Sequence, residues 1–145
     1  MTMASGLYVP AWRDALDTSD AVLNLLLSTN KCDLYLDAKT PNFETDAAYS
    51  ATNEVATATG YTRDTMTVGG TPTWDTVGAG VLKYSWSTTV QWTSATFTAR
   101  GTILHTAAAN LPFCAVTFGA DYTCTNGTFT ITANASGIFT VDLVP

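Results

Sequence analysis

The chain has 145 residues, a length that suits a single domain spanning residues 1–145. Only 12% of the residues are charged and 46% are hydrophobic, whereas soluble monomers average about 25% charged residues, so the composition favours a subunit of an assembly. The formal net charge of −6, six scattered basic residues and apolar runs too short for a membrane helix argue against a nucleic acid or a membrane as partner.

The first thirty residues are predicted to form an N-terminal arm with a short helix. Trp12, Ala15 and Leu16 follow Pro10 at the spacing of an amphipathic helix. A second helical turn is predicted over residues 18–27, although this apolar run could equally be a buried strand. Because the first residues lack the basic and apolar regions of a signal peptide, we expect synthesis and folding in a cytoplasm.

Strand patterns start at residue 31. Residues 31–37 alternate between an apolar and a polar face, which predicts the first strand of a sheet. Residues 40–59 are rich in Thr, Ala, Asn and acidic residues without periodicity, which predicts a long surface loop. Loops of this length are usually functional or mobile, and in an assembling subunit this one would reach onto a neighbour. An edge strand is predicted to follow over residues 60–68.

The second half of the chain predicts a succession of short strands separated by turn signals. Threonine and aromatic residues fit a pleated, half-buried surface, and Asn126 followed by Gly127 is typical of a tight hairpin. The predicted fold class is mainly β: a single-domain antiparallel β-sandwich or jelly-roll-like barrel over residues 31–145, with a short N-terminal helix or arm in residues 1–30. The strands are predicted over residues 81–86, 89–93, 96–106, 113–118, 127–133 and 138–144.

Groups that could carry catalysis or bind a metal are few. His105 is the only histidine, and we expect it to be structural or on the surface, because a metal site or a triad needs partners beside it. Glu44 and Glu54 could be paired glycosidase carboxylates, but both lie in the irregular loop, whereas catalysis needs rigid positions. We therefore expect no enzyme activity, no catalytic residue, no metal and no cofactor. The remaining acidic clusters are interpreted as helix-start or solvated residues: Asp14, Asp17 and Asp20, and Asp33, Asp37, Glu44 and Asp46.

The cysteine spacing indicates neither a zinc site nor a disulfide framework. Cys32, Cys114 and Cys124 form no C-x-x-C pair and are odd in number, so we expect them to be reduced. Cys114 lies in an apolar segment and is typical of a buried core residue. A bridge between Cys114 and Cys124 stays open on the sequence alone.

Four segments, taken in order, carry a resemblance. They read NEVATATGYT at residues 53–62, VQWTSATFTAR at 90–100, FGAD at 118–121 and NGTFTITANASGIF at 126–139. Together they resemble a family of small structural proteins of tailed bacteriophages, whose members typically read N-E-V-x-G-T-G-Y-T, V-T-W-x-x-x-T-F-T-A-R, F-G-x-D and N-G-T-F-T-I-x-W-x-x-x-G-I-F. The resemblance spans roughly residues 31–141. The chain departs from the pattern at Ala56 and Ala58, where the family often has Gly, and at Ala133, where it often has Trp.

The resemblance implies a virion protein without catalytic activity that decorates the outside of the capsid. Such a protein would bind the phage major capsid protein, bridge its subunits and commonly assemble as a homotrimer, after synthesis in the host cytoplasm. The low charge and the long irregular loop predict that residues 2–12 and the 40–59 loop supply the contacts to the capsid or to a neighbouring subunit, and the side chains predicted to do so are Leu7, Tyr8, Trp12, Phe43 and Tyr49.

Two other functions stay open on the sequence. Trp74, Trp86 and Trp92, with Tyr84, could stack on sugars in a carbohydrate-binding β-sandwich adhesin, although core filling and subunit contacts use such residues more often. A tail structural subunit is the other alternative, and its place in the virion would distinguish it.

Overall fold

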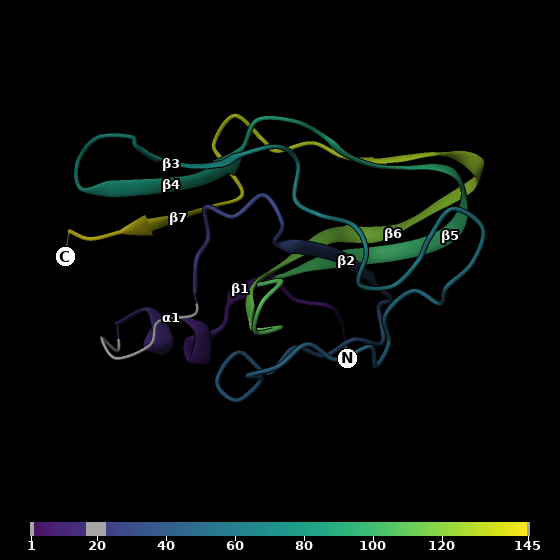
Figure 1. Ribbon diagram of the computed structural model, residues 1–145, viewed down its shortest axis with the longest axis horizontal. Helices are drawn as coiled ribbons and strands as arrows, with labels where there is room; N and C mark the ends of the chain where they lie inside the picture. Colours follow the sequence, from purple (N-terminus) through teal and green to yellow (C-terminus); the bar gives the residue numbers. More distant parts are fainter. Residues whose placement is uncertain (1, 17–22, 145) are drawn as a thin grey trace.

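The computed structural model describes residues 2–16 and 23–144, and it is mainly β, as the sequence predicts. Its strands form two antiparallel sheets, one in the order β1-β6-β5-β2 and the other in the order β3-β4-β7 (Figure 1). The elements are β1 (Gly6–Leu7), α1 (Val9–Leu16), β2 (Lys31–Tyr35), β3 (Pro72–Thr76), β4 (Val81–Trp86), β5 (Val90–His105), β6 (Pro112–Ile131) and β7 (Phe139–Asp142).

A long ribbon of β5 and β6 replaces four of the predicted short strands. β5 has 16 residues and β6 has 20, and they pair from one end to the other. At the predicted breaks the chain forms irregularities in which Ser94, Gly119 and Asn126 take positive φ angles of 51°, 81° and 46°. Asn126 and Gly127 therefore belong to a bulged part of the ribbon opposite Ala95, and the predicted hairpin turn at this place is wrong.

The segment between β2 and β3 contains no helix or strand, so the predicted edge strand over residues 60–68 is wrong. Its backbone instead makes isolated bridges to β2, between Lys31 and Thr67 and between Tyr35 and Glu54. β1 and β3 were not predicted, and β3 lies at a sheet edge, where its first residue Pro72 removes no central ladder bond. The predicted turn over residues 18–27 falls partly outside the described residues, and residues 23–27 form no helix.

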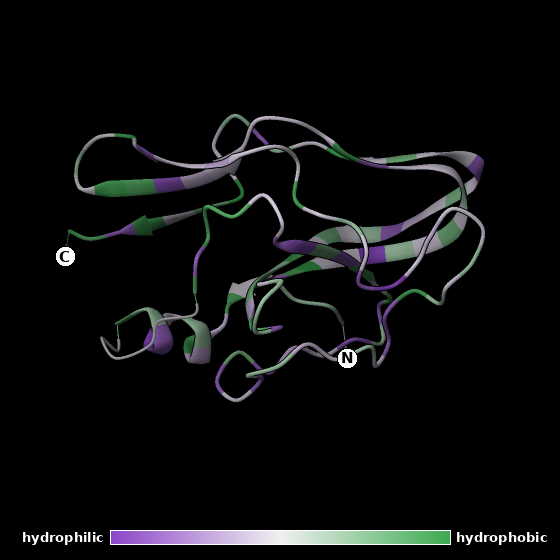
Figure 2. Ribbon diagram, viewed as in Figure 1, coloured by the Kyte–Doolittle hydropathy of each residue, from purple (hydrophilic) through white to green (hydrophobic). Residues whose placement is uncertain are grey.

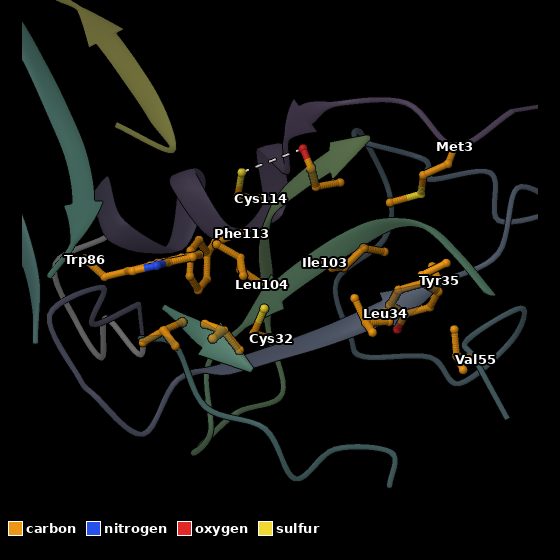
Figure 3. Packing of buried hydrophobic residues seen from close by; sticks show 14 of the residues in the cluster. Met3, Cys32, Leu34, Tyr35, Val55, Trp86, Ile103, Leu104, Phe113 and Cys114 are labelled. Carbon is orange, nitrogen blue, oxygen red and sulfur yellow. Dashed lines mark hydrogen bonds between the residues drawn. The ribbon is translucent and has the colours of Figure 1, made fainter. Parts of the chain in front are cut away.

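The core lies mainly on the large sheet, and Tyr84 and Trp86 of β4 add to it from the small sheet. Apolar and polar residues alternate along β5 and β6 (Figure 2), and the buried set gathers around Leu104 and Phe113 (Figure 3). Tyr84 of β4 joins the sheets, because its ring packs edge-on against Phe113 at 6.1 Å and its hydroxyl donates to the Leu25 carbonyl at 2.9 Å. Each large side chain buried in this way contributes about 1.5–3 kcal/mol to folding.

All three cysteines are free thiols. Cys114 and Cys124 lie ten residues apart along β6, where a strand rises about 3.3 Å per residue, so a bridge between them is geometrically excluded in this fold. Burial raises the pKa of Cys32 to about 12 and that of Cys114 to about 12. These two thiols are therefore protonated core residues at neutral pH.

Candidate functional site

The outer edge of β6 is open over most of its length. β1 pairs with only two of its residues, Cys114 and Ala115, and within residues 2–16 and 23–144 no other strand lies on that side. Between residues 116 and 131 the strand has no Lys or Pro, and its one charged residue, Asp121, is ion-paired with Arg100 at 3.2 Å. Proteins usually protect open edges with charges, Pro or a covering segment. This edge has little such protection and can pair with another chain.

An open groove of about 830 Å³ runs along the same stretch of β6. Phe129 and Cys124 face it, and they lie opposite Trp92 and Phe97 of β5, so the groove continues the core face of the ribbon outward. Tyr122 at its end is 52% exposed. The lining carries no charged side chain; it consists of Phe118, Tyr122, Thr123, Cys124, Thr128, Phe129, Thr130, Ile131, Thr132 and Asn134. We call this surface, with the adjoining open edge, the β6 groove.

A second apolar surface lies on the outer side of α1. It has an open volume of about 430 Å³ and includes Leu7 and Trp12, two of the predicted contact residues. Val9 is 53% exposed and Leu16 is 82% exposed, which is unusual for aliphatic residues on a helix that packs on a core. We call Leu7, Val9, Trp12, Arg13 and Leu16 the α1 surface. Leu7 and Trp12 thus lie where a partner could reach them.

The other three predicted contact residues point into the protein. Tyr8 is 1% exposed and its ring packs on Phe43 at 5.1 Å, while the Val9 amide donates to the Phe43 carbonyl at 2.7 Å. Tyr49 is half-buried, and its hydroxyl donates to Glu54. In this conformation these side chains fasten the 40–59 loop to the N-terminal arm and to the core, so the expectation of partner contacts through Tyr8 needs correction. A side chain that is already buried in the subunit exposes no apolar surface that a partner could remove from water.

The segments that carry the family resemblance meet in space. Tyr61 donates to Glu54 at 2.7 Å, accepts from the Leu34 amide at 3.0 Å, and packs against Trp92 and Phe97 at ring distances of 6.1 and 5.5 Å. Arg100 also forms an ion pair with Asp121 at 3.2 Å, at the bulge of β6 between the residues that pair with Ala99 and Gly101 of β5. Phe129 completes the cluster, 5.9 Å from Trp92 and 5.2 Å from Phe97. These motif residues therefore hold the irregular segment against the ribbon.

The backbone at Gly60 shows why one of these motifs contains a glycine. It has a φ of +78°, and a Cβ at this position would lie 2.6 Å from the Cα of Ala95. Only glycine combines this backbone conformation with so close an approach to β5.

A buried polar cluster lies at the end of β5. His105 is completely buried, and its Nε2 lies 2.7 Å from Asp33 Oδ2 and 3.5 Å from Asp64 Oδ1. Asp33 Oδ1 accepts from the Asp64 amide at 3.0 Å. The ring of Tyr49 packs on the imidazole at 4.8 Å. His105 is thus a buried residue with two acidic partners, and Asp64 carried no signal in the sequence that would have placed it here.

The acidic residues that are close together in the sequence have separate partners in the described structure. Asp37 pairs with Arg100 at 3.3 Å, Asp46 accepts from the Asn42 amide at 3.0 Å, and Asp33 faces His105 instead. Asp14 accepts from the Leu23 amide at 3.0 Å, and its predicted companions at positions 17 and 20 lie outside the described residues.

Glu54 is the second buried carboxylate, after Asp33. Glu44 is exposed, and no contact in the described structure joins it to Glu54, so the two do not form the glycosidase-like pair considered from the sequence. Tyr49 and Tyr61 both donate to Glu54, and the Arg63 Nε lies 3.9 Å from its Oε2. Desolvation by burial nevertheless raises the pKa of Glu54, and the two tyrosine hydrogen bonds offset this only in part.

A Glu54→Gln variant tests this pKa shift. Because the folded-state pKa lies above the unfolded value, the contribution of Glu54 to stability is fully present below about pH 4.3 and is lost as the pH rises through the folded pKa. The unfolding free energy of the native protein minus that of Glu54→Gln should therefore fall between pH 4.5 and pH 8, as measured by urea unfolding. His105 and the surface groups are common to both proteins and cancel in the difference. A difference that rises with pH would contradict the shift.

The aromatic residues proposed as a sugar platform are mostly inside the protein. Tyr84, Trp86 and Trp92 are 0%, 5% and 3% exposed. Trp74 is half-buried, with its ring against Trp12 at 6.3 Å and other aromatic rings nearby. Tyr84, Trp86 and Trp92 are too buried in this conformation for a sugar to stack on them, and Trp74 is the one member of the proposed platform that is partly exposed.

Comparisons with protein-family models, curated proteins and solved structures find no match to this chain. Within the described residues no helix is both long and apolar enough to cross a membrane. The features of the chain that bear on function are the β6 groove, the α1 surface and the resemblance of the four segments.

Proposed function

We propose that this protein is a structural virion protein of a tailed bacteriophage, which decorates the outer surface of the capsid and stabilises it by bridging major capsid protein subunits as a homotrimer. The observation that carries the proposal is the β6 groove: a long open strand edge beside an uncharged surface of aromatic, aliphatic and threonine side chains. In a free monomer such an edge promotes uncontrolled pairing, whereas in an assembly subunit it is covered by a neighbour.

The β6 groove and the α1 surface suit a closed ring of three subunits. A three-fold contact is heterologous, so each subunit presents one surface to one neighbour and a different surface to the other neighbour. The β6 groove and the α1 surface are two such surfaces on separate elements. Main-chain hydrogen bonds along the β6 edge would give affinity, and the groove residues would give specificity.

Trimerisation would convert weak capsid contacts into stable decoration. Three linked copies bind a three-fold position with an effective concentration set by their geometry, which raises the overall affinity without new contacts. Bridging adjacent capsid subunits would then oppose their separation under internal DNA pressure. Low surface charge serves this role, because buried subunit seams are depleted in charged residues.

Electron cryo-microscopy of virions from the phage that encodes the chain tests the proposal. We expect trimeric density on the capsid exterior that bridges neighbouring capsomers and accommodates this fold. Density for the chain in the tail would replace the proposal by a tail-subunit function. A glycan-array signal that disappears in Trp74→Ala, without capsid density, would replace it by carbohydrate binding.

A further inference from the structure

Three potential metal ligands from separate parts of the chain meet at the end of β5. Asp33 belongs to β2, Asp64 to the irregular segment that precedes β3, and His105 ends β5. One ligand atom of each lies within 4.8 Å of the others. The side chains of His105 and Asp33 are 0% and 1% exposed, while that of Asp64 is 43% exposed. The cluster is therefore buried on two sides and open toward solvent on the Asp64 side.

The hydrogen bonds of His105 place a positive species beside its Nε2 atom. Nδ1 lies 3.1 Å from the Thr106 carbonyl oxygen, which can only accept, so Nδ1 carries a hydrogen. Nε2 then faces the carboxylate oxygens of Asp33 and Asp64. A neutral ring of this tautomer would direct its lone pair at two negative oxygens, which is unfavourable in a buried site. A proton or a metal cation must lie there.

Asp64 distinguishes between these two possibilities. A proton on Nε2 is shared with Asp33 Oδ2 at 2.7 Å, and Asp64 Oδ1 then keeps only the longer ion-pair contact to Nε2 at 3.5 Å and no hydrogen-bond donor. Buried acceptors in native proteins are rarely left unpaired. A cation would bind all three atoms at once.

We propose that Asp33, Asp64 and His105 bind a divalent transition-metal cation of the zinc type. One imidazole nitrogen and two carboxylate oxygens form a donor set that zinc accepts, with water from the exposed Asp64 side as fourth ligand. Ligand bonds of about 2.0–2.2 Å in a tetrahedron separate donor atoms by roughly 3.4 Å. The 3.5 Å between His105 Nε2 and Asp64 Oδ1 already fits. Asp33 Oδ2 would move about 0.7 Å away from Nε2, and the two carboxylate oxygens, which lie within 4.8 Å of each other, would take up the same spacing. The bond from Nδ1 to the Thr106 carbonyl orients the ring as in other metal sites.

The cation clamps the irregular segment onto the large sheet. Asp64 lies 31 residues from Asp33 and Asp33 lies 72 residues from His105, so one ion joins segments that are distant in the sequence. Because the ligands are brought together only in the folded chain, metal binding stabilises the fold. This role is independent of the proposed capsid function.

Zinc titration of the native protein and of Asp64→Asn tests the proposal. Asp64 has a φ of 53°, a conformation that Asn also adopts readily, and its side chain is partly exposed, so the variant should fold. Asp37→Asn is the matched control, since it removes a carboxylate from a surface ion pair with Arg100. Isothermal titration calorimetry should give one zinc site in the native protein and in Asp37→Asn, and at least roughly tenfold weaker binding in Asp64→Asn.

The single histidine gives a second, direct measurement. Imidazole ¹⁵N signals in NMR spectra belong to His105 alone. Zinc should remove the proton from Nε2, keep the hydrogen on Nδ1, and raise Tm, and EDTA should reverse all three changes. If zinc leaves the ring signals and Tm unchanged, a proton occupies the site and the proposal is wrong. Equal zinc affinity in the native protein and Asp64→Asn would also overturn it.

Discussion

Trp92→Ala should lower the free energy of unfolding by about 3–5 kcal/mol, the range for removing a large aromatic residue from a core. Trp92 is 3% exposed and its ring contacts Tyr61, Phe97 and Phe129 at 5.9–6.4 Å. Its Nε1 has no hydrogen-bond partner in the described structure, so the loss comes from packing alone. Because domains are stable by only about 5–15 kcal/mol, this change removes a large part of the total.

Urea or thermal unfolding of three variants measures this effect. Trp92→Phe retains a ring against Tyr61 and should lose less than half as much. Gln91→Ala changes the neighbouring exposed residue of β5, and it should stay within about 0.5 kcal/mol of the native protein. A loss of less than about 1 kcal/mol in Trp92→Ala would show that the irregular segment does not depend on this cluster.

Tyr122→Lys should abolish the trimer and the capsid occupancy while leaving the fold intact. Tyr122 lines the β6 groove and is 52% exposed, and its main intramolecular ring contact is with Phe118 at 6.2 Å. A lysine here places a charge in the uncharged groove proposed as the subunit seam and on an open edge, which opposes strand pairing. Exposed substitutions usually change stability by about 0.5 kcal/mol or less, so the monomer should remain folded.

Light scattering coupled to size-exclusion chromatography measures the first consequence, and binding to capsids that lack the protein measures the second. Thr62→Lys adds the same charge at an exposed position outside the 40–59 loop, the β6 groove and the α1 surface, and should leave both unchanged. A trimer that persists in Tyr122→Lys would mean that the β6 groove is not the subunit seam. A native protein that is monomeric and does not bind capsids would contradict the proposed function itself.

The fold class and several local elements could be predicted from the sequence, because they depend on neighbouring residues. β4 was predicted with its observed bounds, the short helix lies where Trp12 and Leu16 indicated it, and residues 40–59 are irregular as expected. Alternation along a strand and helical spacing are local patterns that one segment contains by itself.

The continuity of β5 and β6 could not be predicted, because a positive-φ residue marks a turn or a bulge equally well. Only pairing with the opposite strand decided that Ser94 and Asn126 bulge while the ribbon continues. That outcome created the open β6 edge, which is the basis of the proposed function.

The sequence by itself determined that this chain is β-rich and low in charge, since these properties follow from composition and local periodicity. Only the tertiary structure decided which residues are available to a partner. Tyr8 and Phe43 resembled surface anchors but pack on each other, while Tyr122 and Ile131 line an open groove. The tertiary structure also places Asp33 beside His105, which lies 72 residues away in the sequence. Burial and such meetings depend on strand register and on segments distant in the chain, which no local pattern contains.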